Sequence, residues 1–489
     1  MTSNEWLLAK TFVSFRVFRG SIIFENETAV QRNFRLYRCA HRLPRQRRVL
    51  RHQKTRHGQR LEQRPEARSR AHRVGNACDG GGDVYHESSV RGTGESLRGA
   101  PDKKNLTQVI VVNSGNANAC TGKQGMADAR EMVSFTEKTL ALPAGRALVC
   151  STGRIGVPMP MDNIRAGILE AAMELGVTSA HADRTAEAIM TSDSHPKQIA
   201  IEFKLGGKTV RIGGICKGAG MIQPGMSATG ARPATLPHGG LHATMLSFIT
   251  TDAAVNKKVL QAALNEAVAH SFNRITVDGD MSTNDTVLVL ANGRAGNSPL
   301  VAADVRRLHS KSKIVRASSR RLLQDLDIFQ SALNHVCLEL AKKIVRDGEG
   351  VHRVVTVRVN GAKTIQDADA AARAVANSAL VKTSWHGGDP NWGRIIDAIG
   401  YSAAKVVEEK IDIGYSAVGG KKILWSLKRG QPTKATFKEL CASVAPKEFE
   451  LHINLNLGQA NAVMYAADLT EQYVDYNKGD VTDPTTLGG

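Results

Sequence analysis

The chain has 489 residues, 42% of them apolar and 23% charged, enough to bury a sizeable core and to form roughly two to four domains. No stretch reaches the roughly 18 to 20 uncharged apolar residues that a membrane-spanning helix needs, and no collagen-like glycine period is present, which excludes both classes. The formal net charge is +19, but residues 1–104 hold 22 Lys and Arg against 10 Asp and Glu, so most of the excess lies in the first fifth of the chain.

Residues 1–105 show no sustained period of 2 or 3.6, and the stretch 35–73 is rich in Arg, His and Gln. Three interpretations are open: an organelle transit peptide, a nucleic-acid-binding arm that neutralises phosphates, or an extension outside the packed core. Early acidic residues weaken the first, and the scarcity of aromatic residues for base stacking weakens the second. We therefore predict a basic extension that is not part of the core, and no nucleic-acid binding.

The next segment predicts two consecutive strand–loop–helix units. Residues 108–112 form a short apolar run typical of a buried strand, and an amphipathic segment follows over 126–140. The pattern repeats with a strand at 147–150 and a helix that begins near Asp162 and is predicted to end at Gly176.

The rest of the chain predicts a mixed sheet-and-helix fold. Residues 199–203 and 209–212 flank a Gly-Gly pair, which indicates a hairpin, and an amphipathic helix is expected over 257–269. Further strands are expected at 274–277, 287–290, 354–359 (closed by an Asn360-Gly361 turn) and 451–457, whose alternation indicates a half-exposed strand. The predicted fold class is α/β, with layered mixed sheets and helices.

Two segments interrupt this regular pattern. Residues 227–242 are small, Pro- and Gly-rich and without periodicity, and residues from about 299 to 325 carry seven Lys and Arg between Arg306 and Arg321. Both are interpreted as insertions.

Metal and nucleotide-phosphate sites have weak support. The seven cysteines are widely spaced and never form a Cys-x-x-Cys pair, which argues against a disulfide framework or zinc site and favours a reducing compartment. Gly207-Lys208-Thr209 lacks the glycine that a phosphate loop needs five positions earlier, where Glu202 stands. The acidic stretch at 278–285 lacks the acid that closes a calcium loop, since that position is Val289. No metal is expected.

What remains is a set of glycine-rich loops with small hydroxyl residues. Glycines let backbone amides approach a ligand and supply donors for an anionic centre. Each loop alone is typical of a plain turn, but their recurrence favours one composite pocket. They cover residues 113–122, 151–156, 217–224 and 387–394.

Ordered motifs in and beyond these loops indicate a known family. They are Val-Val-Asn-Ser-Gly-Asn-Ala-Asn-Ala-Cys-Thr-Gly (111–122), Ser-Thr-Gly (151–153), Lys-Gly-Ala-Gly-Met-Ile (217–222), Ala-Thr-Met-Leu (243–246), Asp-Gly-Glu-Gly (347–350), Gly-Gly-Asp-Pro-Asn-Trp-Gly-Arg-Ile (387–395) and Asp-Leu-Thr-Glu-Gln-Tyr-Val (468–474). From about residue 106 to its end, the chain resembles the glutamate N-acetyltransferase/ornithine acetyltransferase family of arginine biosynthesis. The resemblance implies a self-cleaving acyltransferase of the N-terminal-nucleophile type.

The resemblance further implies self-cleavage between Ala243 and Thr244, into an alpha chain (106–243) and a beta chain (244–489) that stay together as a heterotetramer. The Thr244 hydroxyl would attack the preceding carbonyl, and hydrolysis of the ester would free the Thr244 α-amine. That amine has a pKa of about 7.7 to 8.0 in model peptides, so it can act as a base beside its own hydroxyl. Thr244 would then carry the acetyl group from N2-acetylornithine to glutamate by a ping-pong mechanism.

Further site residues are carried over from the matching motifs. Thr152 and Gly153 match the oxyanion-stabilising pair, where one donor is worth about 10²- to 10³-fold in rate. Lys217 offers a cation to a substrate carboxylate, and Glu349 can meet an ammonium group. The full set of matched substrate-contacting positions is Thr191, Lys217, Thr244, Glu349, Asn477 and Thr482.

Two departures from the family pattern concern the nucleophile and the N-terminus. Residues 227–242 separate Met226 from Ala243 and contain two further Ala-Thr bonds, but only Thr244 continues into Met-Leu-Ser-Phe. An insert beside the scissile bond could abolish self-cleavage, since displacing a reacting group by about 1 Å can lower the reaction rate about 10²-fold. Residues 1–105 also lack the family's first strands. We therefore hypothesise that residues 1–105, 227–242 and 299–325 derive from an imperfect gene model. Sequencing the mature transcript tests this, and finding all three segments in it would contradict the hypothesis.

Two alternatives to acetyl transfer stay open at this stage: a self-processing amide hydrolase, in which water accepts the acyl group, and an inactive uncleaved chain whose basic arm binds nucleic acid. No cofactor is expected, and acetyl-CoA is open as a co-substrate. The expected partners are the small molecules N-acetylornithine and glutamate, without a membrane. The resemblance implies the mitochondrial matrix, or a plastid, for a eukaryotic source and the cytoplasm for a bacterial one.

Overall fold

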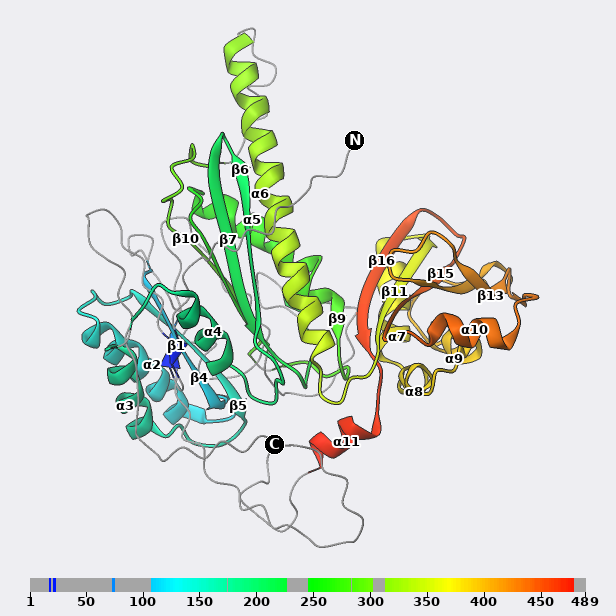
Figure 1. Ribbon diagram of the computed structural model, residues 1–489, viewed down its shortest axis with the longest axis horizontal. Helices are drawn as coiled ribbons and strands as arrows, with labels where there is room; N and C mark the ends of the chain where they lie inside the picture. The colour runs from blue at the N-terminus through cyan, green and yellow to red at the C-terminus, as the bar shows by residue number, and fades with distance from the viewer. Residues whose placement is uncertain are drawn as a thin grey trace, which may run out of the picture.

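The computed structural model describes residues 107–173, 175–226, 245–282, 284–301 and 313–478, except for the side chains of 313–319, together with three two-residue strands near the N-terminus. These strands are β1 (Val17–Phe18), β2 (Ser21–Ile22) and β3 (Arg73–Val74). The described strands form three sheets, and the predicted α/β class is confirmed (Figure 1). None of the helices in this part of the chain is long and apolar enough to cross a membrane.

The first sheet contains the two predicted strand–loop–helix units. Strands β4 (Val109–Asn116) and β5 (Ala147–Arg154) pair in parallel, and their apolar residues are almost fully buried, as is typical of parallel sheets. The helices of this part of the chain are α2 (Gly122–Thr139), α3 (Met161–Ala171) and α4 (Ser179–Ala188). Strands β1–β3 join the edge of the same sheet.

The predicted end of α3 at Gly176 is wrong, because the helix already ends at Ala171. Gly176 has a packing role instead of a helix-capping one. A Cβ atom at this position would lie 2.0 Å from the ring of His181, whose side chain completes the capping box of α4. A larger residue at this position would displace the ring from the capping box.

The second sheet has the strand order β10–β8–β7–β6. The predicted hairpin is confirmed as β6 (Lys197–Leu205) and β7 (Lys208–Lys217), joined through Gly206 and Gly207, which both have positive φ. Strand β8 (Leu246–Thr251) pairs with β7 and with β10 (Thr286–Ala291).

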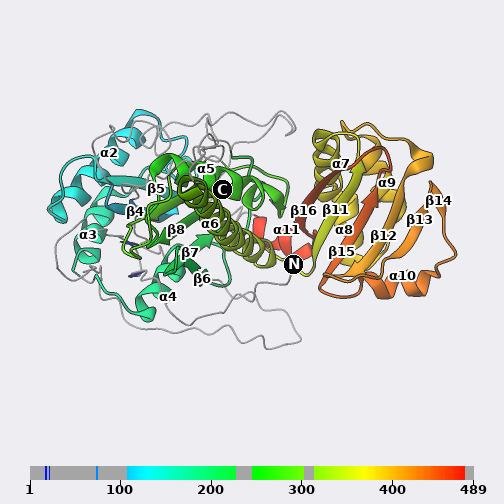
Figure 2. The same cartoon turned by 90° about the horizontal axis from the view of Figure 1, so that it is seen from above.

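This second sheet is buried on both faces. Ile215, Phe248 and Leu288 share a core with the first sheet. The opposite face packs against α5 (Lys257–Ala269), which has the predicted bounds, and against the long helix α6 (Lys313–Arg346). The resulting order of layers is helices, sheet, sheet, helices (Figure 2).

The interpretation of residues 299–325 as an insertion needs correction. Residues 313–325 form the first part of α6, continuous with the helix that covers the second sheet. Asp325 accepts a hydrogen bond of 3.1 Å from the backbone of Gly206, and Leu322 packs against the core. The basic residues obscured this helix, because an exposed helical face tolerates many charges. Residues 227–242 lie outside the described residues.

The third sheet has the order β14–β13–β12–β15–β11–β16–β9 and its own core (Figure 1). Its strands are β9 (Ile275–Thr276), β11 (Val354–Ala362), β12 (Asp412–Ala417), β13 (Leu424–Lys428), β14 (Gln431–Pro432), β15 (Glu448–Asn454) and β16 (Ala460–Ala467). Its helices are α7 (Ile365–Asn377), α8 (Ala379–Gly387), α9 (Trp392–Gly400) and α10 (Phe437–Val444). The short helix α11 (Glu471–Asn477) follows β16 and contributes no residue to this core.

Two predictions in the third sheet are wrong. Strand β15 is not half-exposed, because it lies between β11 and β12, and its polar Glu450 is buried in a paired interaction with Arg358. Strand β11 does not end in a turn at Asn360-Gly361 but continues through a register shift to Ala362. A polar residue in a strand can be buried when a neighbouring strand supplies its partner. The alternation of apolar and polar residues is then the same as in a strand with one exposed face.

Candidate functional site

Thr152 and Gly153 lie at the carboxyl end of β5, where the first sheet faces the end of β7. Gly153 stands opposite Gly115 of β4 and has φ 129°, and a Cβ atom there would lie 2.3 Å from the Gly115 carbonyl carbon. Another residue is therefore excluded both by backbone conformation and by space. Asn284 donates a hydrogen bond of 2.5 Å to the carbonyl of Ser151 and holds the strand end in place.

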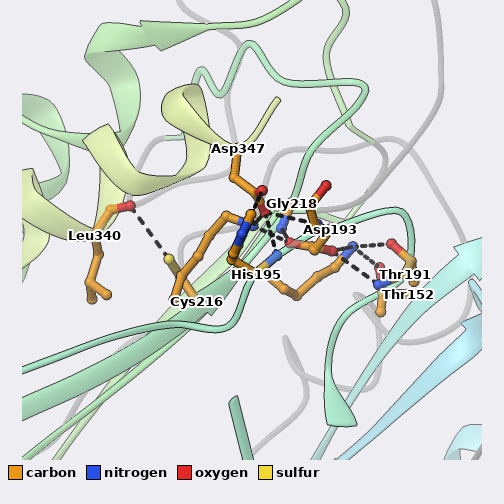
Figure 3. Close-up of polar contacts among 11 residues, drawn as sticks. Thr152, Thr191, Asp193, His195, Cys216, Gly218, Leu340 and Asp347 are labelled. Atoms are coloured by element: carbon orange, nitrogen blue, oxygen red, sulfur yellow. Dashed lines mark hydrogen bonds and ion pairs between the residues drawn. The ribbon is translucent and has the colours of Figure 1, made fainter. Parts of the chain in front are cut away.

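Lys217, at the end of β7, brings the predicted residues together. Its side chain is fully buried, and its ammonium group donates hydrogen bonds to Thr191 Oγ1 at 2.6 Å and to Thr152 Oγ1 at 3.3 Å (Figure 3). Three predicted site residues from separate elements thus meet at one buried point.

Asp193 is a central residue of this site that sequence reasoning missed. Its carboxylate lies 3.6 Å from Lys217 Nζ and 2.6 Å from Lys197 Nζ, and it accepts a hydrogen bond of 2.7 Å from the Gly218 amide. Burial by itself would raise the pKa of Asp193, but the two ammonium groups outweigh burial and hold this pKa well below its usual range. Asp193 is therefore a buried anion that compensates two buried cations.

The network continues through Lys197, which bridges the carboxylates of Asp193 and Asp347, both labelled in Figure 3. Lys197 Nζ lies 2.5 Å from Asp347 Oδ2, the atom that also accepts from the backbone amides of Ser194 and His195 at 3.0 and 3.2 Å. Burial opposes the charge of Lys197, but Asp193 and Asp347 raise its pKa above the ordinary value. Asp347 belongs to the Asp-Gly-Glu-Gly motif, whereas Asp193 and Lys197 carry no motif that could have identified them.

Glu349 and Asn477 form a second part of the site. Asn477 in α11 donates a hydrogen bond of 2.9 Å to Glu349 Oε2, and the Glu349 amide donates to the Ala219 carbonyl at 3.0 Å. A Cβ atom at Gly220 would lie 2.4 Å from the same Glu349 oxygen. The carboxylate of Glu349 therefore lies directly against the glycine-rich loop that follows Lys217.

A cavity of about 400 Å³ lies beside this network. Its lining includes Lys197, Lys343, Arg346, Asp347 and Tyr476 of α11. Arg346 is already paired with Glu448 at 2.8 and 3.0 Å. The cavity borders the buried charges and the helix that carries Asn477.

Asp278 fixes the loop that follows Lys217. The sequence analysis had considered this residue only as part of a calcium loop and had rejected that loop. Its carboxylate accepts hydrogen bonds from the amides of Met221 at 2.5 Å and Ile222 at 2.9 Å. Met221 has φ 59°, a left-handed conformation that costs a non-glycine residue free energy. The carboxylate compensates that cost by fixing the loop.

We predict a pH-dependent effect of Asp278→Asn on stability. Burial raises the pKa of Asp278 to about 6, above the unfolded value near 3.9. The folded state therefore favours the protonated acid, and wild-type stability falls as pH rises from about 4 through 6. Relative to the variant, we expect wild type to lose up to about 3 kcal/mol, the free energy that corresponds to a pKa difference of about 2 between the folded and unfolded states. Urea unfolding from pH 4 to 7 measures this, and parallel curves would contradict it.

The predicted scissile bond between Ala243 and Thr244 lies outside the described residues, as does Thr482. The next residue after Thr244 is described: Met245 is fully buried, and its amide donates to Asp285 at 3.0 Å. Strand β8 then begins with Leu246 paired to Lys217. The described chain next to the predicted nucleophile thus lies beside the Lys217 network.

Comparison with known proteins identifies relatives along most of the chain. The family model described as the ArgJ family matches residues 88–480, so its match begins inside the basic extension. The arginine biosynthesis bifunctional protein ArgJ of Symbiobacterium thermophilum is 43% identical over 396 residues, 81% of this chain and 87% of that protein. The glutamate N-acetyltransferase of Methanocaldococcus jannaschii is 41% identical over 376 residues, 76% of this chain and 83% of that protein. A crystal structure of ArgJ from Bacillus halodurans is 39% identical, with a TM-score of 0.41, covering 48% of this chain and 99% of that chain.

Proposed function

The chain belongs to the ArgJ family, and from this premise we propose that it transfers the acetyl group of N2-acetylornithine to glutamate through Thr244 in arginine biosynthesis. The observation that carries the proposal is the fully buried Lys217, which donates hydrogen bonds to both Thr191 and Thr152. Such a group is costly to bury and is typical of a site that binds or stabilises negative charge.

The first step in the proposal creates the nucleophile. The Thr244 hydroxyl attacks the Ala243 carbonyl, the Ala243–Thr244 amide bond breaks, and an ester forms in its place. Water hydrolyses this ester, which leaves a new carboxylate on Ala243 and a free α-amine and hydroxyl on Thr244. The products are the alpha and beta chains, which we propose stay associated as a heterotetramer.

The acetyl transfer then uses the two groups of Thr244. The hydroxyl oxygen attacks the acetyl carbonyl of N2-acetylornithine, and its proton passes to the α-amine. Collapse of the tetrahedral intermediate breaks the amide bond, and the α-ammonium group returns the proton to the leaving ornithine amine. Attack of the glutamate amine on the acetyl ester reverses this sequence, giving N-acetylglutamate and free Thr244.

The geometry of Thr152 suits an oxyanion donor. Its Oγ1 atom accepts a hydrogen bond from Lys217, so its own hydroxyl hydrogen is available to another acceptor. The Gly153 amide would supply a second donor from the same strand end. Together they would stabilise the negative oxygen of the tetrahedral intermediate.

We expect Glu349→Gln to impair binding of the acetylornithine donor more than the use of glutamate. Acetylornithine carries a side-chain ammonium group that a carboxylate can bind, and a charged hydrogen bond is worth about 1.5 to 3 kcal/mol. The KM for acetylornithine should therefore rise roughly 10- to 100-fold. Steady-state kinetics measures this, with Glu409→Gln, an exposed carboxylate, as the control. An equal rise in both KM values would contradict the assignment.

The assay that tests the overall proposal follows ornithine release from acetylornithine with and without glutamate. Acetyl transfer predicts N-acetylglutamate in amounts equal to ornithine. Free acetate formed at the same rate without glutamate would instead support the amide hydrolase. A third arm with acetyl-CoA and glutamate tests whether acetyl-CoA is a donor. A mitochondrial, plastid or cytoplasmic location stays a proposal that depends on the source.

A further inference from the structure

We propose that His352, His386 and Asp468 form a binding site for a divalent transition-metal ion, with Zn²⁺ as the representative ion. One ring nitrogen of each histidine and one carboxylate oxygen of Asp468 all lie within 4.8 Å of one another. His352 lies in the segment before β11, His386 lies near the end of α8, and Asp468 is the residue that follows β16. The site is separate from the Lys217 network.

Two buried atoms in this cluster have no hydrogen-bond partner. The Asp468 side chain is fully buried, and its Oδ1 atom accepts hydrogen bonds of 3.0 Å from the amides of His352 and Arg353. Its Oδ2 atom and the Nδ1 atom of His386 are unpartnered, 3.4 Å apart. A buried polar atom without a partner destabilises the folded state. A shared metal ion would satisfy both atoms at once.

The outer contacts of both histidines favour metal binding through Nδ1. His352 Nε2 lies 3.1 Å from Gln472 Oε1, and His386 Nε2 lies 2.9 Å from Glu471 Oε2. Since these oxygens accept hydrogen bonds, we assign the ring proton to Nε2, which leaves the lone pair on Nδ1. Metal-binding histidines almost always donate their other N–H to such an oxygen.

A charged His386–Asp468 ion pair is the competing explanation for the cluster. The two explanations make different predictions, because only a metal site requires His352 and binds an added divalent ion. Two imidazoles and a carboxylate suit Zn²⁺, Co²⁺ or Ni²⁺ better than Mg²⁺ or Ca²⁺.

The position of the cluster suggests what a bound ion would do. Asp468 lies two residues before Thr470, which caps α11 and donates a hydrogen bond of 2.7 Å to the Gly350 carbonyl. Helix α11 carries Asn477, the partner of Glu349. A metal ion would therefore fasten the start of α11 to the loop that presents Glu349.

The test uses the full-length protein after chelator treatment and dialysis, titrated with CoCl₂ and followed by visible absorption and calorimetry. Wild type is compared with His352→Gln/His386→Gln. A matched control, His270→Gln/His335→Gln, removes two histidines outside the cluster and accounts for binding by other histidines. We expect wild type and the control to bind one more equivalent of Co²⁺ than the cluster variant, with a tetrahedral-type cobalt spectrum. The same isotherm and spectrum in the cluster variant would overturn the proposal.

A second variant guards against a folding defect. Asp468→Asn keeps an oxygen that can accept from the His352 and Arg353 amides but loses the anionic ligand. We expect ZnCl₂ to raise the thermal unfolding temperature of wild type and of the control variant, and to have a much smaller effect on Asp468→Asn, since affinity should fall at least about 10-fold. An equal rise in Asp468→Asn would also overturn the site.

Discussion

Replacing Thr244 by alanine is expected to leave one unbroken polypeptide and to reduce acetyl transfer by at least about 10³-fold. The hydroxyl of Thr244 is needed twice in the proposed mechanism, first to break the Ala243–Thr244 bond and then to carry the acetyl group. Alanine removes both steps at once, and without cleavage no α-amine is formed. Denaturing electrophoresis, N-terminal sequencing and the coupled ornithine assay measure the three consequences separately.

Conservative and neighbouring variants serve as controls for Thr244→Ala. Thr244→Ser keeps a hydroxyl, so we expect two bands and measurable activity. Thr229→Ala and Thr235→Ala alter the other two Ala-Thr bonds and should cleave as wild type does. Two bands from Thr244→Ala, or a new N-terminus at residue 229 or 235, would show that Thr244 is not the nucleophile. Unbroken, inactive wild-type protein would show that residues 227–242 prevent processing.

Replacing Asp193 by asparagine should have the largest effect on stability. The substitution removes the buried anion between Lys197 and Lys217 and leaves their charges uncompensated. Breaking one partner of a buried pair costs about 3 to 5 kcal/mol. The low pKa of Asp193 in the folded state means that its carboxylate also stabilises the fold in a pH-dependent way. This stabilisation is present above the unfolded pKa near 3.9 and is lost as pH falls below it. Urea unfolding at pH 7 measures the loss.

A double variant separates stability from positioning. Asp193→Asn/Lys197→Met removes one charge of each sign, so it should recover part of the lost stability but not the activity, because Lys217 would still lack the carboxylate that orients it. Asp162→Asn is the control, since its side chain is 97% exposed in the ion pair with Arg165 and should change stability by no more than about 1 kcal/mol. Recovery of kcat together with stability would contradict a positioning role for Asp193.

Much of the fold follows local patterns in the sequence. Apolar runs identified β4, β5 and β10, the Gly206-Gly207 pair identified the β6–β7 hairpin, and the helical period gave the bounds of α5. The errors arose where tertiary contacts decide burial. The basic start of α6 looked inserted, and β15 looked half-exposed although Arg358 neutralises its Glu450. The contacts of α6 with the second sheet and the pairing of Arg358 with Glu450 join residues far apart in the chain, so a short window of sequence does not reveal them.

The candidate site divides in the same way. Family motifs gave Thr152, Gly153, Thr191, Lys217, Glu349 and Asn477. The structure brings Thr152, Thr191 and Lys217 together at one buried point, with Gly153 next to Thr152 in β5, and it places Glu349 and Asn477 against the loop that follows Lys217. Asp193 and Lys197 belong to no recognised motif, and the partner of Lys197, Asp347, is 150 residues away in the sequence.

The sequence by itself determined the α/β class, the family and the residue types available for acetyl transfer, because strand and helix periods and ordered motifs are local properties of the chain. Only the tertiary structure decided which charges compensate one another in the interior and which histidines face Asp468. Burying a charge is tolerated only when a partner reaches it, and partners such as Asp347 for Lys197 lie far away in the sequence.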